Sequence, residues 1–157
     1  MPEGEIVVDD PRAPDVRSLL AQHVTLMRSQ TPIEDVHALD VEDLLNPSIT
    51  FFGFRRHGQL LAVGAIKELD AGHAELKSMH TIAEARRQGI GRAMVEHLVA
   101  LARERGYERV SIETGSMEEF VPARLLYAQM GFERCGAFGE YAESPNSAFM
   151  TLRLGGN

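Results

Sequence analysis

Apolar residues recur with helical and strand periods along the N-terminal half of the chain. Residues 14–27 carry apolar side chains three and four positions apart, which predicts an amphipathic helix. A shorter helix is expected at residues 35–45, ending before Pro47. The dipeptide His57-Gly58 is typical of a hairpin turn. Short apolar or alternating runs predict strands at residues 6–9, 49–56, 60–69 and 73–81.

The C-terminal half predicts a strand–helix–strand unit followed by one more helix. A strongly amphipathic run at residues 91–105 is stopped by Gly106 and followed by an alternating strand at residues 109–114. Together with the strand at 73–81 this is a βαβ unit, so its two strands should be parallel. A helix at residues 122–130 and strands at 132–135 and 148–154 complete the chain. We expect a three-layer α/β fold, in which helices cover both faces of a mixed sheet.

Composition narrows the class of protein further. The chain has 157 residues, is 44% hydrophobic and carries a net charge of −7, so we expect one domain over residues 1–157 and no binding to nucleic acid or to an anionic membrane. One cysteine excludes an internal disulfide, and the spacing of the histidines fits no metal site. The longest apolar run is too short for a membrane span, and the acidic start is no secretory signal. A cytoplasmic location is therefore expected.

Candidate chemistry lies at the start of the helix at 91–105. The sequence there reads Arg86-Arg87-Gln88-Gly89-Ile90-Gly91-Arg92. Two glycines at a helix start leave the backbone N–H groups bare, and such a start binds anions, so a diphosphate is the expected ligand. The alternative is a tight turn with a solvated basic rim. The run is no dinucleotide fingerprint, because Met94 stands where the third glycine belongs.

This Arg-x-x-Gly-x-Gly run resembles the pyrophosphate-binding motif of the GNAT superfamily of N-acetyltransferases, which holds coenzyme A in that family. A second stretch, Leu126-Tyr127-Ala128-Gln129-Met130-Gly131-Phe132, is similar to the family's other signature. The resemblance covers essentially the whole chain, loosely before Ile49. Glu113-Thr114-Gly115 and Phe149-Met150 are similar to one bacterial group of acetyltransferases within it.

The resemblance implies a mostly antiparallel mixed sheet in which the parallel strands of the βαβ unit splay apart. The pantetheine arm of acetyl-CoA would enter the gap, and backbone N–H groups of residues 87–92 would bind the diphosphate. This sequence has Ala83 where the family has proline and Arg87 where it has glycine. The implied cofactor-binding residues are Met79, Thr81, Arg86, Arg87, Gln88, Gly89, Ile90, Gly91, Arg92 and Tyr127.

The family's reaction is attack of an amine on the thioester carbonyl of acetyl-CoA. It needs a base for the amine proton, a donor for the oxyanion and an acid for the departing sulfur. A strand N–H near Met79 is implied as the oxyanion donor, and Tyr127 matches the family's general acid. The alternative for Tyr127 is a core aromatic, because it shares a stripe with Phe120, Ala123 and Met130.

Three residues are candidates for the base that accepts the amine proton. Strand alternation predicts that Glu75, Lys77, Met79 and Thr81 share one face, so Glu75 can receive a proton if that face is the cleft. The alternative is a structural carboxylate paired with Lys77. Glu113 is the competitor, and His80 ranks third because alternation puts it on the opposite face. Cys135 is expected to be a buried apolar residue.

The acceptor site falls on segments that neither motif covers. In this fold it enters between residues 26–33 and 138–146, where Tyr141 with Glu140 and Glu143 could bind a cationic amine or simply form an exposed acidic loop. We expect direct acetyl transfer from acetyl-CoA, in a ternary complex, to the primary amine of a small molecule, a peptide N-terminus or a lysine. The alternative is a noncatalytic acyl-CoA-binding or sensing module. Relatives are often dimers, so the resemblance also suggests a homodimer.

Overall fold

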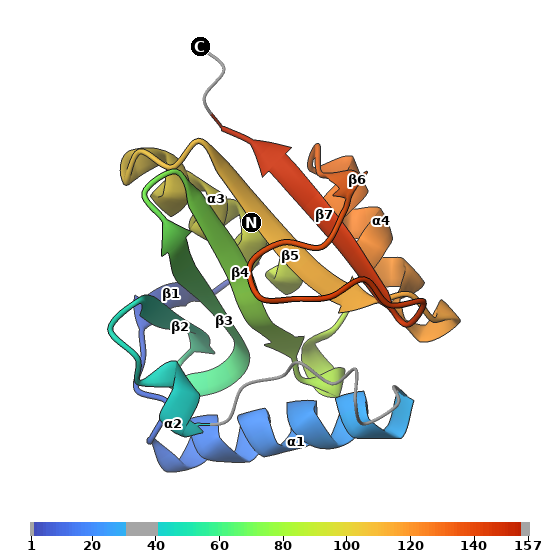
Figure 1. The fold of residues 1–157 in the computed structure, drawn as a ribbon. Helices are drawn as coiled ribbons and strands as arrows, with labels where there is room; N and C mark the ends of the chain where they lie inside the picture. Colours follow the sequence, from blue (N-terminus) through green and yellow to red (C-terminus); the bar gives the residue numbers. More distant parts are fainter. Residues whose placement is uncertain (1, 31–40, 155–157) are drawn as a thin grey trace.

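The structure is a computed structural model that describes residues 2–30 and 41–154. Within these residues seven strands form one sheet in the order β1-β2-β3-β4-β5-β7-β6 (Figure 1). β4 and β5 are parallel, and every other neighbouring pair is antiparallel. The strands are β1 (Glu5–Val8), β2 (Ile49–Arg56), β3 (Gln59–Asp70), β4 (His73–Thr81), β5 (Arg109–Gly115), β6 (Glu133–Cys135) and β7 (Ser147–Arg153). The predicted mixed sheet with one parallel pair is confirmed.

Helices cover both faces of this sheet, as the sequence predicts. They are α1 (Pro14–Gln30), α2 (Val41–Leu44), α3 (Ile90–Glu104) and α4 (Val121–Gln129), with 3₁₀ turns η2 (Ala83–Ala85) and η3 (Glu118–Phe120) that the sequence did not predict. One core cluster joins α3 and α4 to the sheet, and a second joins α1 and α2 to the other face. In Figure 1 α3 and α4 lie behind the sheet and α1 runs below it. None of the described helices is long and apolar enough to cross a membrane.

Element boundaries agree with the predicted ones to within a few residues, with one part untested. β2 and β4 have the predicted bounds. The helix predicted at residues 35–45 is seen only as Val41–Leu44, because residues 35–40 lie outside the described part of the chain.

The helix of the βαβ unit is α3, and its sequence explains both of its ends. It begins after Gly89, whose φ of +82° lies in the left-handed region, and it is followed by Gly106 at φ +84°. Its apolar stripe is buried against β3, β4 and β5. The buried residues are Ile90, Ala93, Met94, Val95, Leu98, Val99 and Ala102.

Two polar networks join neighbouring elements of the fold. On the buried end of β4, a ring nitrogen of His73 lies 2.7 Å from the Ser111 hydroxyl, which in turn lies 2.8 Å from the hydroxyl of Thr151 on β7. At the start of α1, the Arg55 guanidinium binds Asp9 at 2.8 Å and Asp15 at 2.7 Å. The first network links β4, β5 and β7, and the second holds α1 against β2.

Candidate active site

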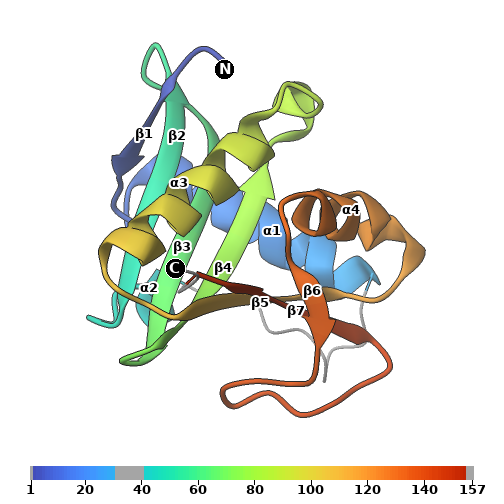
Figure 2. The same ribbon diagram turned by 90° about the horizontal axis from the view of Figure 1, so that it is seen from above.

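The parallel strands β4 and β5 pair only over the first part of their length. Their register runs from His73 opposite Arg109 to Leu76 opposite Ile112 and ends there. Figure 2, which looks from above, shows the two strands diverging beyond that point, with α4 beside the opening. The β5-facing backbone of β4 after Leu76 therefore has no ladder partner on β5. This is the splayed pair that the family resemblance implied.

A β-bulge lies on β4 at the point where the splay begins. Val63 pairs with His80 and Ala65 pairs with Lys77, so two residues of β4, Ser78 and Met79, oppose the single residue Gly64. Ser78 has a φ of +58°, which a non-glycine residue seldom adopts. A side chain at Gly64 would lie 2.8 Å from Met94 Cγ and 2.9 Å from Met79 Sδ, so the glycine makes room for both methionines. The bulge bends β4 away from β5.

The bulge reverses the alternation of side chains, so one sequence-based prediction is wrong. Glu75 and Lys77 do not share a face with Met79 and Thr81. Met79 packs in the core cluster on the α3 side, whereas His80 contacts His23 of α1 on the face that carries Glu75 and Lys77. Simple alternation fails because the extra residue shifts the period by one position.

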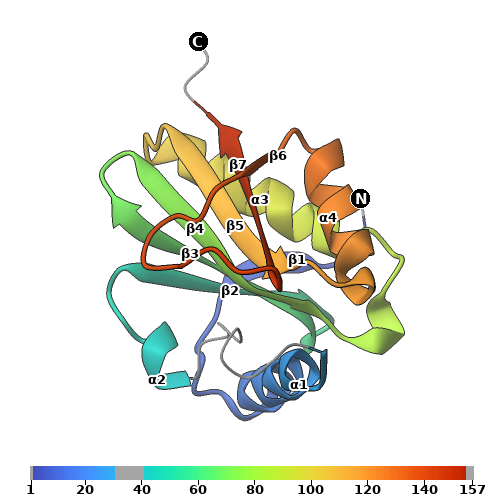
Figure 3. The same ribbon diagram turned by 45° about the vertical axis from the view of Figure 1, so that its right-hand side comes forward.

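A pocket of about 120 Å³ occupies the gap between β4 and β5. It is lined by both strands, by His23 of α1, by Tyr141 of the segment between β6 and β7, and, at α4, by Phe120, Ala123 and Tyr127. Figure 3 shows that segment passing in front of β4 and β5. Three of the residues predicted to be catalytic, Glu75, Glu113 and Tyr127, line this one pocket.

Tyr127 projects from α4 into the pocket, and its side chain is largely buried. The residue is 5% exposed, and its ring lies 5.8 Å from that of Phe132. Burial raises the pKa of the Tyr127 phenol far above its usual value, so the hydroxyl keeps its proton at neutral pH. Tyr127 is thus both a core aromatic and a phenol at the pocket wall, and the two interpretations of the sequence are compatible.

Glu75 is one of two carboxylates at the pocket. It is buried, and its Oε2 accepts hydrogen bonds from Lys77 Nζ at 3.0 Å and from the Tyr141 hydroxyl at 2.5 Å. Glu113 reaches the pocket from β5, which leaves two carboxylates as candidate bases. Burial, followed by the charges of Glu75 and Glu113, raises the pKa of the Tyr141 phenol well above its usual range.

Two imidazoles form a pair at the α1 side of the pocket. His23 lines the pocket, and its Nδ1 lies 3.2 Å from Nδ1 of His80. Burial lowers the pKa of each ring to about 4, with help from His80 in the case of His23 and from Arg86 in the case of His80. Both rings are therefore neutral near pH 7. Sequence reasoning missed His23, although it lies four positions after Leu19 on the apolar stripe of α1.

The predicted diphosphate loop is exposed and leads directly into α3. Gly89 is the N-cap residue, and a side chain there would meet nothing within 4 Å, so its left-handed backbone and not space requires glycine. Arg87 adopts a φ of +66° at the position where the related motif has glycine. The Gln88 side chain accepts a hydrogen bond at 3.1 Å from Arg56 of β2, a residue that neither sequence motif includes. Arg92 pairs with Glu96, and Arg86 donates to the Thr81 carbonyl.

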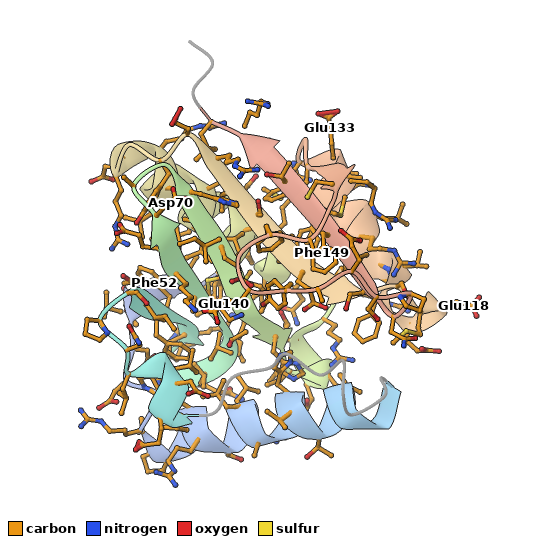
Figure 4. All side chains as sticks on the ribbon, viewed as in Figure 1. Phe52, Asp70, Glu118, Glu133, Glu140 and Phe149 are labelled. Carbon is orange, nitrogen blue, oxygen red and sulfur yellow. The ribbon has the colours of Figure 1, made fainter. Side chains whose placement is uncertain are left out.

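The segment between β6 and β7 contributes Tyr141 to the pocket wall, and its two acidic residues, Glu140 and Glu143, are exposed. Glu143 accepts a hydrogen bond from the Ala137 backbone within the segment, and Glu140 is exposed (labelled in Figure 4). Tyr141 is the one member of the predicted trio that reaches the pocket. Cys135 was predicted to be buried, and it is half-buried on β6. Among residues 2–30 and 41–154 no cluster of three metal-ligating side chains occurs.

Comparisons with known proteins agree on the class to which this fold and pocket belong. A Klebsiella pneumoniae structure assigned as an acyl-CoA N-acyltransferase superposes with a TM-score of 0.78 at 24% identity, covering 96% of this chain and 97% of that one. A GNAT family acetyltransferase from Elizabethkingia anophelis, solved with acetyl-CoA bound, gives 0.73 at 15% identity over 97% and 99% of the two chains. The fold is that of the acyl-CoA N-acyltransferases.

Sequence comparison identifies the family. The model of the acetyltransferase (GNAT) family matches residues 16–132. The uncharacterized N-acetyltransferase YsnE of Bacillus subtilis is 45% identical over 149 residues, which are 95% of this chain and 99% of that protein. The chain belongs to the GNAT acetyltransferase family and is an N-acetyltransferase of that family.

Proposed function

We propose that this protein transfers an acetyl group from acetyl-CoA to the primary amine of a small molecule, a peptide N-terminus or a lysine, by direct attack in a ternary complex. One observation carries the proposal. A protonated phenol, Tyr127, and two carboxylates, Glu75 and Glu113, line a single pocket at the splay of β4 and β5. Such a pocket combines a proton donor with proton acceptors, which amide formation from a thioester requires.

The binding of acetyl-CoA would use backbone groups along β4 and at the start of α3. The pantetheine amides would pair with the strand edge that the splay leaves without a partner, near Met79 and Thr81. The diphosphate would lie against the exposed N–H groups that follow Arg87 and Gly89, where the dipole of α3 favours an anion. Arg86 and Arg92 would add positive charge at the same place.

Groups at the pocket can account for every bond and every proton in the transfer step. The amine nitrogen forms a bond to the thioester carbon, and the carbonyl oxygen, which gains negative charge, accepts a hydrogen bond from a backbone N–H at the bulge near Met79. The carbon–sulfur bond then breaks, and the thiolate takes the Tyr127 proton. The amine loses its own proton to Glu75 or Glu113, directly or through water.

Direct attack fits the pocket better than a covalent acetyl-enzyme. A covalent route needs a nucleophile such as a thiolate at the thioester. Cys135 is the chain's single cysteine and lies on β6, away from the residues that line the pocket, and partial burial raises the pKa of its thiol.

The test is release of free thiol from acetyl-CoA by the purified protein across a panel of small amines, amino acids and short peptides. Calorimetry with acetyl-CoA is run beside it. We expect micromolar to millimolar acetyl-CoA binding and amine-dependent thiol release with at least one class of acceptor. Binding without release for every amine would contradict the proposal and favour the noncatalytic acyl-CoA-binding module. Release without added amine would indicate thioester hydrolysis.

A further inference from the structure

A buried ion pair in the pocket is bridged by a tyrosine from a distant part of the chain. Glu75 and Lys77 lie on β4 with side chains 4% and 8% exposed, and their Nζ–Oε2 distance is 3.0 Å. The Tyr141 hydroxyl accepts a hydrogen bond from Lys77 Nζ at 2.6 Å and donates one to Glu75 Oε2 at 2.5 Å. The three groups therefore form a closed triangle of contacts.

The Tyr141 hydroxyl offsets part of the desolvation cost of the buried ion pair. Two buried charges lose their hydration, and their attraction repays that cost only if further hydrogen bonds satisfy both groups. The Tyr141 hydroxyl supplies one such bond to each charge. Because burial and the neighbouring carboxylates raise its pKa, the phenol stays protonated and keeps donating to Glu75.

The ring of Tyr141 is held in place independently of its hydroxyl. It packs 5.3 Å from the ring of Phe138 and 5.7 Å from that of Phe149, and the Lys77 ammonium lies 5.2 Å from its centroid. In Figure 4 Phe149 lies on β7 beneath the β6–β7 segment. The aromatic cluster fixes the segment on the sheet, and the hydroxyl then reaches Glu75.

The geometry also decides which carboxylate oxygen is engaged. Both Lys77 and Tyr141 donate to Oε2, so neither uses Oε1. A carboxylate held at one oxygen by two donors has a fixed plane, which also fixes the direction of its other oxygen.

We propose that Tyr141 is a positioning residue of the acceptor site, which orients Glu75 so that Oε1 binds the acceptor ammonium group and receives its proton. This role rests on the proposed acetyl transfer. It makes the β6–β7 segment part of the acceptor site, and it favours aliphatic amines, which are cationic at neutral pH, as acceptors.

The test compares Tyr141→Phe, Glu75→Gln and the double variant in steady-state thiol release. Tyr141→Phe keeps the aromatic packing and removes the hydroxyl alone. We expect kcat/KM for the amine to fall about 10- to 100-fold, the value of one hydrogen bond to a charged group, with KM for acetyl-CoA within about twofold of the parent. If Tyr141 acts through Glu75, adding Tyr141→Phe to Glu75→Gln causes no further loss.

Tyr107→Phe is the matched control. Its hydroxyl also donates to a carboxylate, that of Glu68 at 2.7 Å, and Tyr107 is buried while Glu68 is exposed; neither residue lines the pocket. We expect that variant to keep the parental kcat/KM. An equal loss in both tyrosine variants, a parallel rise in KM for acetyl-CoA, or full additivity with Glu75→Gln would overturn the role of Tyr141. Absence of thiol release by the parent with every amine would instead overturn the proposed function, and this role with it.

Discussion

Nδ1 of His23 on α1 and Nδ1 of His80 on β4 lie 3.2 Å apart, within hydrogen-bonding distance. One ring must carry a proton on this nitrogen and the other must not, so two imidazolium ions are incompatible with the contact. The β-bulge at Ser78 is what turns His80 toward α1. The bulge thus shapes the site twice, since it opens the strand pair and also joins β4 to α1.

The histidine pair predicts a loss of stability in mild acid. The pKa of each ring is about 4 in the folded protein and about 6.5 when unfolded, so the unfolded chain binds protons first as the pH falls. The free energy of unfolding contributed by the pair should be intact above pH 6.5 and fall between pH 6.5 and 4, by up to about 1.4 kcal/mol per pH unit for each ring. Urea unfolding across this range measures it.

The reference for that experiment is a variant with glutamine at both positions, His23→Gln with His80→Gln. Subtracting its pH profile removes the contribution of the carboxylates. Parallel profiles of the parent and the double variant would show that the pair is not held neutral.

The backbone conformation of Arg87 predicts that a glycine variant at this position is more stable than an alanine variant. Its φ of +66° costs an L-residue on the order of 1 kcal/mol and costs glycine nothing. Arg87→Gly and Arg87→Ala both remove the guanidinium, so their difference isolates the backbone. We expect the glycine variant to be more stable by about 0.5–1 kcal/mol in chemical denaturation. The reverse order would mean that the loop does not hold this conformation.

Gly91 tests the diphosphate site. A β-carbon there would meet Leu126 at 3.8 Å and Thr81 at 3.9 Å, which are ordinary contacts. Gly91→Ala should therefore fold and gain up to about 1 kcal/mol from better helix propensity. Gly91→Glu would place an anion beside the bound diphosphate, so acetyl-CoA affinity measured by calorimetry should fall at least about tenfold. Equal affinities of the two folded variants for acetyl-CoA would show that the diphosphate does not bind at the start of α3.

The bulge shows where prediction from this sequence ends. Regular periodicity gave the strands, the α3 stripe and the parallel pair, because each is a repeat that buried surfaces impose. A single extra residue at Ser78 interrupts the two-residue alternation of side chains along β4. No local sequence pattern predicts this bulge. Glu75 and His80 were therefore placed on opposite faces, although they share one.

Contacts between residues that are distant in the sequence could not be predicted from it either. The hydrogen bond from Arg56 to Gln88 and the reach of Tyr141 to Glu75 join residues that are far apart in sequence, and only the three-dimensional register brings them together. His23 could have been found, because it continues the helical stripe of Val16 and Leu19. The single domain over residues 1–157, the cytoplasmic location and the homodimer stay predictions, and so do the roles of the site residues.

Tyr127→Phe tests the proposal that the Tyr127 phenol donates the proton to the departing thiolate. The variant keeps the ring that packs on Phe132 and removes only the hydroxyl, so the melting temperature should change little. We predict that kcat for acetyl transfer falls about 100-fold while the calorimetric affinity for acetyl-CoA stays within about twofold. A folded variant with the parental kcat would show that Tyr127 is a packing residue and not the proton donor.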